Sequence, residues 1–288
     1  MTRETDVDNA VIDLQAMQPE HLEGALTLSR QAGWPHRLED WQMLLRLSEG
    51  LVVMDGQRVV ATTFMTPYGV DMATINMVIV DESLRGRGIG RLLMMKALEL
   101  AGDRTCRLVA TEDGLPLYRK LGFVETGEIF QHQGLLAALP APSADVGWAV
   151  GADRSQIEVL DRGAIAADRR DLISYLFAQG RFAVLKDAGV VRGYGAIRDF
   201  GRGEVIGPVV AETAAQARSL LAFIMAGRPL GTFLRVDLDG HTDLAPWLVA
   251  HGLMPVGGGI AMHRPGSVAA ASCAPRIHRF ALASQALG

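Results

Sequence analysis

Three closely spaced glycines that follow an apolar run are the residues of this chain best suited to bind a ligand. Gly86, Gly88 and Gly90 follow the run at residues 77–80 at alternate positions. Because glycine has no Cβ, the backbone at such positions can approach a ligand closely. The pattern predicts a strand, a tight loop and a helix, and the free N–H groups and dipole at a helix start attract anions. The spacing therefore predicts a phosphate or pyrophosphate site.

Fixed positive charge flanks these glycines, because Arg85 and Arg87 lie between and beside them. A nucleotide P-loop would need a Lys-Ser or Lys-Thr pair, which the chain lacks. A dinucleotide fingerprint would need Gly-x-Gly-x-x-Gly, whereas the chain has Gly-x-Gly-x-Gly. Neither of these two common phosphate motifs explains the loop.

The pattern Arg85-x-x-Gly88-x-Gly90 resembles the acetyl-CoA signature of the GNAT (GCN5-related) N-acetyltransferases. Residues 117–123, with the sequence Leu-Tyr-Arg-Lys-Leu-Gly-Phe, resemble the second landmark of that family at the expected separation. The resemblance covers about residues 10–135. It implies an enzyme that moves an acetyl group from acetyl-CoA directly to a primary amine of an unidentified acceptor, either a small molecule or a peptide.

The resemblance also implies roles for particular residues. The strand at residues 78–80 would pair with the pantetheine amides, and the N–H near Val80 would face the thioester oxygen. Tyr118 would protonate the leaving thiolate, with a packed core tyrosine as the alternative. Apart from the resemblance, Asn76 on the central strand is a candidate to orient a water that relays the proton. The residues expected to bind the cofactor are Val78, Ile79, Val80, Arg85, Gly86, Arg87, Gly88, Ile89, Gly90 and Arg91.

Several questions stay open at this point. His36 and His132 are candidate general bases because imidazole titrates near neutral pH. Glu112 and Asp113 lie where many members of the family have an asparagine, and Asp113 is also a candidate helix N-cap. The alternative function is a non-catalytic acyl-CoA sensor or regulatory module.

The composition indicates a globular protein of 288 residues, with 49% hydrophobic and 21% charged residues. Cys106 and Cys273 are its two cysteines, and the histidines lack ligand spacing, so neither a disulfide scaffold nor a metal site is expected. Since the N-terminus is polar and no apolar stretch reaches about 18 residues, we expect no signal peptide and no membrane span. The expected location is the cytoplasm.

The charge is unevenly distributed. Residues 1–145 carry 13 Lys/Arg and 20 Asp/Glu, whereas residues 146–288 carry 15 and 12. An acidic first half favours a cationic amine as acceptor, although solvent screens much of this effect. No basic stripe is present, so no nucleic-acid partner is expected. The expected state is a monomer or a weak homodimer.

Apolar periodicity predicts the elements that must position these residues. The elements expected in the first half are, in order, a strand at 10–17, helices at 19–31 and 38–48, a hairpin of strands 51–54 and 58–65, a strand at 74–80, a helix at 88–100, a strand at 107–111, a helix at 116–121 and a hairpin at 123–133. This order predicts an α/β fold with a twisted mixed, largely antiparallel sheet flanked by helices.

The second half of the chain repeats features of the first. Val190-Val191 repeats Val59-Val60, and Gly252-x4-Gly257 repeats Gly122-x4-Gly127, at a separation of about 130 residues. We therefore expect tandem GNAT-like domains, as in a bacterial two-domain subfamily. The expected boundaries are a catalytic domain at 1–138, a linker at 139–150 and a degenerate domain at 151–288.

The second domain is expected to bind no cofactor. Leu220-Leu221 repeats Leu92-Leu93, and this repeat aligns Gln216 with Gly88. The repeat of the glycines aligns Leu248 with Tyr118. A side chain would then fill the pyrophosphate position. The apolar residues near the C-terminus predict that the tail at 272–288 folds back as an ordered segment.

Overall fold

A computed structural model describes residues 13–240, 242–267 and 276–288. The chain packs as two compact units. One contains Met1–Pro67 and Ala73–Gly102, and the other contains Tyr68–Met72 and Asp103–Gly288.

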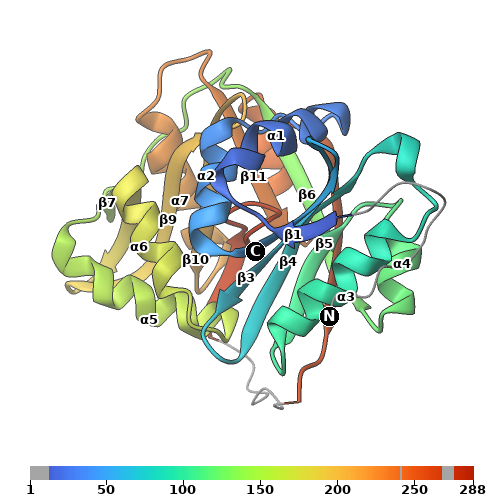
Figure 1. Cartoon of the computed structure of the whole chain (residues 1–288). Helices are drawn as coiled ribbons and strands as arrows, with labels where there is room; N and C mark the ends of the chain where they lie inside the picture. Colours follow the sequence, from blue (N-terminus) through green and yellow to red (C-terminus); the bar gives the residue numbers. More distant parts are fainter. Residues whose placement is uncertain (1–12, 241, 268–275) are drawn as a thin grey trace. The chain divides into compact units, whose positions relative to one another are not determined.

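The first unit is a small sheet with helices, shown in blue to teal in Figure 1. Its strands lie in the order β1-β2-β3-β4, and the β1–β2 and β2–β3 pairs are antiparallel. Its elements are β1 (Asp13–Ala16), η1 (Pro19–His21), α1 (Leu22–Gln31), α2 (Leu38–Leu47), β2 (Glu49–Asp55), β3 (Arg58–Tyr68), β4 (Met72–Val80), η2 (Glu82–Leu84) and α3 (Ile89–Ala101).

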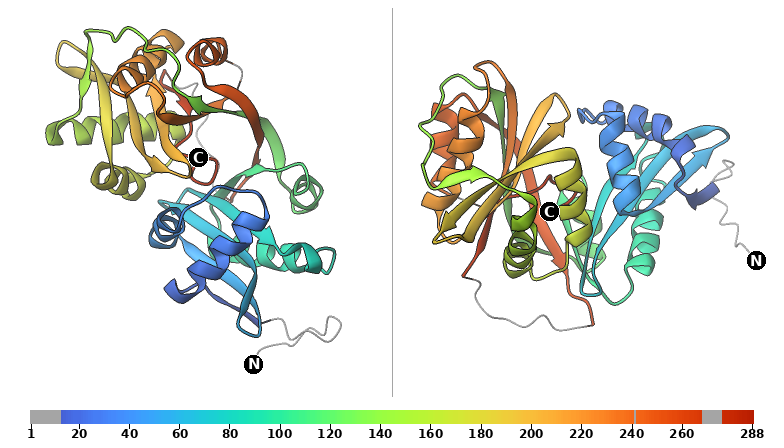
Figure 2. Two further views of the ribbon diagram at one scale, coloured as in Figure 1. Left: turned by 90° about the horizontal axis from the view of Figure 1, so that it is seen from above. Right: turned by 90° about the vertical axis from the view of Figure 1, so that its left-hand side faces the viewer.

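Helices cover both faces of this sheet (Figure 2). Apolar side chains of the strands pack against them. Ile89 and Leu93 of α3 pack in one cluster with Val53 of β2. Trp41 of α2 packs against Phe64 of β3, with ring centroids 5.8 Å apart. The strands thus hold α3, and with it the loop that precedes α3, in a fixed place.

The second unit is a larger mixed sheet whose strands lie in the order β5-β12-β6-β11-β13-β10-β9-β8-β7. Its elements are β5 (Thr105–Ala110), α4 (Leu115–Lys120), β6 (Val124–Leu135), β7 (Val146–Trp148), η3 (Gly151–Asp153), α5 (Arg154–Ile165), α6 (Arg170–Gln179), β8 (Gly180–Asp187), β9 (Val190–Phe200), β10 (Gly203–Ala211), α7 (Ala214–Ala226), β11 (Phe233–Asp239), α8 (Leu244–Ala250), β12 (Met254–Arg264) and β13 (His278–Ala281).

The predicted tandem repeat is confirmed by the element order. The sequence of elements from β7 to β12 repeats that from β1 to β6, except that η2 has no counterpart. We call these two runs the first copy (β1–β6) and the second copy (β7–β12). β7, the counterpart of β1, lies inside the segment expected as a linker. The boundary after residue 138 stays a prediction.

The hairpin predicted at residues 123–133 is wrong, because these residues form one long strand, β6. β6 pairs antiparallel with β12 on one side and with β11 on the other, and β12 also pairs with β5. Strand partners from the second copy keep the segment extended instead, and such distant pairing leaves no local signal in the sequence.

The alignment of Gly88 with Gln216 stays a prediction, and it places Ala217 and Leu221, which are buried in α7, opposite Ile89 and Leu93, which are buried in α3. α3 and α7 are both 13 residues long, and Gly88 is the N-cap of α3 whereas Thr213 is the N-cap of α7. Gln216 is therefore the third residue of its helix. In this alignment α7 begins earlier than α3, and the connection before it is shorter.

Candidate functional site

The segment Asp81–Gly88, which we call the glycine loop, connects β4 to α3. Gly86 and Gly88 have φ angles of +78° and +82°, a region that favours glycine. A Cβ built on either residue would have no atom within 4 Å. The backbone therefore requires glycine here, and the space beside it is open for a ligand.

The start of α3 offers donors and charge to that space. Gly88 is the N-cap, and within the described residues no side chain caps the first turn. Arg85, Arg87 and Arg91 are all exposed around it. Backbone N–H groups at a helix start, together with guanidinium groups, suit a pyrophosphate. This part of the predicted site is local in sequence, and the structure has the predicted strand, loop and helix.

Asp81 holds the glycine loop to the sheet. Its Oδ1 accepts hydrogen bonds from the Ser83 N–H at 2.9 Å and the Ser83 hydroxyl at 2.5 Å. Its Oδ2 accepts from Arg58 Nη1 at 2.8 Å, and its own N–H donates to the Val60 carbonyl at 2.8 Å. Sequence reasoning missed this anchor, although the Asp-x-Ser pattern is a turn signal.

We expect Asp81→Asn to lower the free energy of unfolding at pH 7 by about 1–2 kcal/mol, since charged hydrogen bonds are the stronger ones. The Ser83 hydrogen bond, aided by Arg58, holds the pKa of Asp81 below its usual value. A lowered folded-state pKa contributes stability above the unfolded pKa of about 3.9 and loses it as pH falls through the folded value. Urea titrations at pH 7 and at pH 3 should therefore show a difference that becomes smaller in acid.

Asp55→Asn is the matched control for this prediction. Asp55 also contacts Arg58, at 3.5 Å, but its side chain is half-exposed. Such pairs contribute little, so a change of under about 0.5 kcal/mol is expected. An equal loss from both variants, or a loss from Asp81→Asn that is as large at pH 3 as at pH 7, would contradict the anchoring role.

A kink in β4 sets the direction of residues 78–80. Met77 has a φ of +50°, which is uncommon for a residue other than glycine. The Thr62 hydroxyl donates to the Met77 carbonyl at 2.8 Å, and the Thr63 hydroxyl donates to the Asn76 carbonyl at 3.4 Å. Threonine hydroxyls of β3 thus donate hydrogen bonds to the backbone carbonyl groups at the kink. Nothing in the sequence of β4 itself predicts this kink.

Asn76 is buried at the end of a series of hydrogen-bonded polar side chains. Its Nδ2 donates to the Thr66 Oγ1 at 3.0 Å, and Thr66 Oγ1 lies 2.7 Å from the Ser48 Oγ. Among the described residues, no group donates to the buried Asn76 Oδ1, and the buried Thr74 hydroxyl likewise has no partner. Buried acceptors without partners are costly, so Asn76 is suited to receive a donor from a ligand.

A cavity of about 650 Å³ opens beside the glycine loop. Val80 and Arg85 line it from the strand and the loop, and Gln31 lines it from α1. Val78 and Val80 are themselves half-buried. The cavity therefore lies beside Val80 and the first half of the glycine loop, within one unit.

Tyr118 lies in the other unit, on α4, and is buried. Its ring packs edge-on against Phe123 at 6.1 Å between centroids. Gly114 leaves room for it, because a Cβ there would lie 2.6 Å from the ring. Within the described residues no hydrogen bond to the hydroxyl is found, and burial raises the pKa of Tyr118 to about 12. The phenol is therefore protonated at any physiological pH.

The other candidate bases are placed differently. His132 is buried on β6, and burial lowers its pKa, so it is neutral at pH 7. His36 lies edge-on between Trp34 and Trp41. Asp113 is not the N-cap of α4, since Gly114 holds that position.

In the described ranges, no three His, Cys, Asp or Glu side chains lie together as metal ligands would. Over the same part of the chain, no helix is long and apolar enough to cross a membrane.

Comparison with known proteins gives two family matches and several relatives. A family model described as an acetyltransferase (GNAT) domain matches residues 47–125, and a second model with the same description matches residues 157–272. YitH of Bacillus subtilis (strain 168), described as an uncharacterized N-acetyltransferase, is 26% identical over 254 residues, which are 85% of this chain and 88% of YitH.

Solved structures show the same fold at low identity. A proposed acetyltransferase from Pyrococcus horikoshii has a TM-score of 0.79 at 20% identity and covers 100% of this chain and 99% of its own. A tandem GNAT protein from the clavulanic acid biosynthesis pathway has a TM-score of 0.63 at 18% identity and covers 90% of this chain and 99% of its own. The second likeness agrees with the repeat seen here.

Proposed function

The chain belongs to the GNAT acetyltransferase family and is an N-acetyltransferase, and we propose that it moves an acetyl group from acetyl-CoA directly to a primary amine. The observation that carries this proposal is the glycine loop, with its open space, uncapped helix start and flanking arginines. The acidic first half of the chain favours a cationic amine on a small molecule or a peptide.

Acetyl-CoA fits the residues that are present. A Cβ at Gly86 or Gly88 would point into the open space that a pyrophosphate needs. The residues that would hold it are the N–H groups of residues 86–90 with Arg85, Arg87 and Arg91. Residues 78–80 would pair with the amides of the pantetheine arm as a neighbouring strand does.

Bound acetyl-CoA supplies an activated thioester and a thiolate leaving group. The Val80 N–H, directed by the kink at Met77, would donate to the thioester oxygen and stabilise the charge that develops there. Tyr118, which stays protonated because its pKa is about 12, would donate a proton to the thiolate. These two roles need only a backbone donor and a phenol.

Asn76 would receive the amine or the water that takes its proton. Its Oδ1 is a buried acceptor, and its Nδ2 is fixed on Thr66, so the side-chain amide has one orientation. A neutral amine N–H or an ordered water is a suitable donor for that oxygen. Asn76 is therefore proposed to orient the nucleophile rather than to act as the base itself.

Asn76→Ala should raise the KM for the acceptor about tenfold while the Kd for acetyl-CoA changes less than about twofold, because a lost polar contact is worth about 1.4 kcal/mol. Steady-state kinetics and calorimetry provide the two numbers. Thr74→Val is the matched control, since among the described residues the Thr74 hydroxyl is a second buried polar group without a partner on the same strand. Equal effects from both variants would count against a specific role of Asn76.

The direct test of the proposed function has two steps. In a thermal-unfolding assay, acetyl-CoA at 100 times its Kd should stabilise the protein by about 2.7 kcal/mol. A panel of polyamines, amino acids, aminoglycosides and peptides with free N-termini should then release CoA with at least one acceptor. The absence of stabilisation would refute cofactor binding, whereas binding without turnover across the panel would favour the acyl-CoA sensor.

A further inference from the structure

The second copy has no counterpart of the glycine loop. The residues between β10 and α7 are only Glu212 and Thr213. Thr213 Oγ1 accepts from the Gln216 N–H at 3.2 Å, and Gln216 Oε1 accepts from the N–H groups of Glu212 at 2.9 Å and Thr213 at 3.2 Å. The donors that bind a pyrophosphate in the first copy are therefore used within the chain in the second.

β10 and β11 run side by side only at their beginnings, and β13 enters where they separate. The two strands pair in parallel at Glu204 with Leu234 and at Val205 with Arg235. Beyond an irregularity after Ile206, the partners of β10 change to β13, which runs antiparallel. The pairs are Val209 with Ala281, Val210 with Arg279 and Ala211 with His278, and Ala281 also pairs with Leu238 of β11.

The residues of β10 that bind β13 are the counterparts of those predicted to bind the pantetheine arm. β4 and β10 are both nine residues long and both are irregular at the same place, at Met77 and at residues 207–208. This alignment matches Val78, Ile79 and Val80 with Val209, Val210 and Ala211. A peptide and a pantetheine arm both present secondary amides, which can pair with the same strand edge.

The same alignment matches Asn76 with Gly207. A Cβ at Gly207 would lie 1.8 Å from the Leu282 carbonyl oxygen, so no side chain is possible there. In the second copy, the backbone of residue 282 thus stands where the first copy has the Asn76 side chain. The nucleophile position and the cofactor position are both filled by one segment of the chain.

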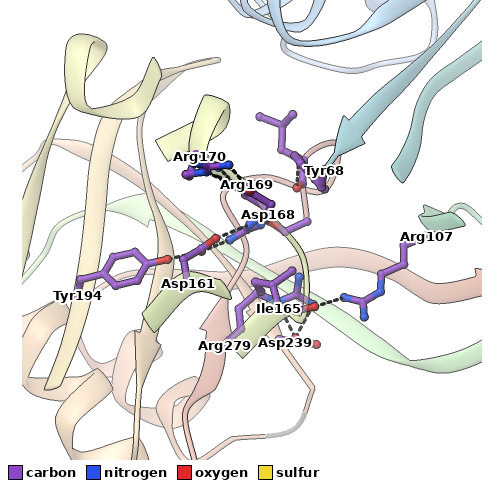
Figure 3. Close-up of polar contacts among 12 residues, drawn as sticks. Tyr68, Arg107, Asp161, Ile165, Asp168, Arg169, Arg170, Tyr194, Asp239 and Arg279 are labelled. Carbon is purple, nitrogen blue, oxygen red and sulfur yellow. Dashed lines mark hydrogen bonds and ion pairs between the residues drawn. The ribbon is translucent and has the colours of Figure 1, made fainter. Parts of the chain in front are cut away.

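Side chains and backbone atoms fasten this segment to β11. Arg279 donates to Asp239 Oδ2 through Nε at 2.8 Å and Nη2 at 2.6 Å, as Figure 3 shows. The Leu282 N–H donates to the Asp237 carbonyl at 2.9 Å. The buried residues of the segment are Phe280, Ala281, Leu282, Ala283, Ser284 and Leu287.

A buried cluster holds the last residues of the chain. Arg169 is fully buried and pairs with Asp161, which also accepts a hydrogen bond from the Tyr194 hydroxyl (Figure 3). Arg169 Nη1 donates to the Gly288 oxygen at 2.6 Å, and the Tyr68 hydroxyl donates to the Leu287 carbonyl at 2.6 Å. The segment is therefore fixed at both ends of its path.

We propose that the separation between β10 and β11 is a binding site for an extended peptide, and that residues 278–283 of this chain are its resident occupant. They take the place in the second copy that the pantetheine arm takes in the first, a comparison that rests on the proposed function. One chain therefore binds one acyl-CoA, and the second copy cannot be loaded.

Hydrogen exchange of the full chain, measured with and without saturating acetyl-CoA, tests the occupancy. Without cofactor, amides of residues 209–211 and 279–282 should exchange at least about 100-fold more slowly than exposed loop amides. Acetyl-CoA should slow exchange at residues 78–91 and leave the other two segments unchanged. Fast exchange of residues 279–282, or a further slowing there with acetyl-CoA, would overturn the proposal.

A disulfide between the strands provides the second test. The variant carries Ala211→Cys and His278→Cys, two positions that pair in register, and Cys273 is replaced by alanine. The remaining cysteine, Cys106, is buried, and burial raises its pKa to about 11, so it stays unreactive. The disulfide should form under mild oxidation, and calorimetry should still give one acetyl-CoA per chain with less than a twofold change in Kd. Failure to form the disulfide, a stoichiometry of two, or loss of binding in the locked chain would each refute the resident strand.

The measurements distinguish a failure of the proposed function from a failure of the resident-strand proposal. If acetyl-CoA does not bind the unmodified chain at all, the proposed function is wrong, while slow exchange at residues 279–282 and formation of the disulfide still report the occupied peptide site. If acetyl-CoA binds twice per chain, the proposed function stands and the resident strand is wrong.

Discussion

Replacing Gly88 with glutamine is expected to weaken acetyl-CoA binding at least about 100-fold, a loss of about 2.7 kcal/mol, while the protein stays folded. Gly88 is the N-cap of α3 and has a φ of +82°. A side chain there would project into the pyrophosphate space and would also strain the backbone that presents the N–H groups. Calorimetry with CoA and acetyl-CoA gives the affinity, and circular dichroism reports the fold.

Gly189→Gln distinguishes the effect of a side chain in the pyrophosphate space from the effect of backbone strain. Gly189 has a φ of +81°, and a Cβ on it would meet nothing within 4 Å, but it lies in the turn between β8 and β9 of the second copy. The variant should carry the same backbone strain, about 1 kcal/mol, and bind acetyl-CoA normally. If Gly88→Gln binds acetyl-CoA as tightly as Gly189→Gln does, the site is not at the glycine loop.

Tyr118→Phe is expected to lower kcat about 100-fold or more, with little change in the Kd for acetyl-CoA, because a general acid typically contributes about 10²–10⁴. Phenylalanine preserves the edge-on contact with Phe123, so packing is maintained. Stopped-flow measurement of CoA release compares the two proteins under single-turnover conditions. A variant with unchanged turnover would show that Tyr118 has only a packing role.

The pH dependence of this variant makes the test stricter. Burial raises the pKa of Tyr118 to about 12, so the phenol is protonated throughout the range from pH 6 to pH 9. The ratio of wild-type to variant kcat should therefore be constant over that range. A ratio that changes tenfold between pH 6 and pH 9 would mean that another group donates the proton. Tyr175→Phe, a half-buried tyrosine on α6, is the matched control and should leave kcat unchanged.

The parts of the site that follow one another in the chain could be predicted from the sequence. A strand, a turn of glycines and a helix start need only contiguous residues, because the φ angles of Gly86 and Gly88 and the N–H groups of α3 are local properties. The repeat of the whole element order was also visible, since it preserves turns and glycines at one spacing. A sequence motif made Tyr118 a candidate proton donor, but its raised pKa depends on burial and could not be predicted.

What only the tertiary structure decided depends on residues far apart in the chain. Residues 10 or more positions apart in the sequence are joined by the Arg58–Asp81 contact, by the Ser48–Thr66–Asn76 hydrogen bonds and by the Thr62 contact at the kink. β6 is one continuous strand because β11 and β12 pair with it, and β13 lies where β10 and β11 separate. Backbone groups bind a strand with little regard to its side chains, so the partner of a strand edge is set by packing and not by local sequence.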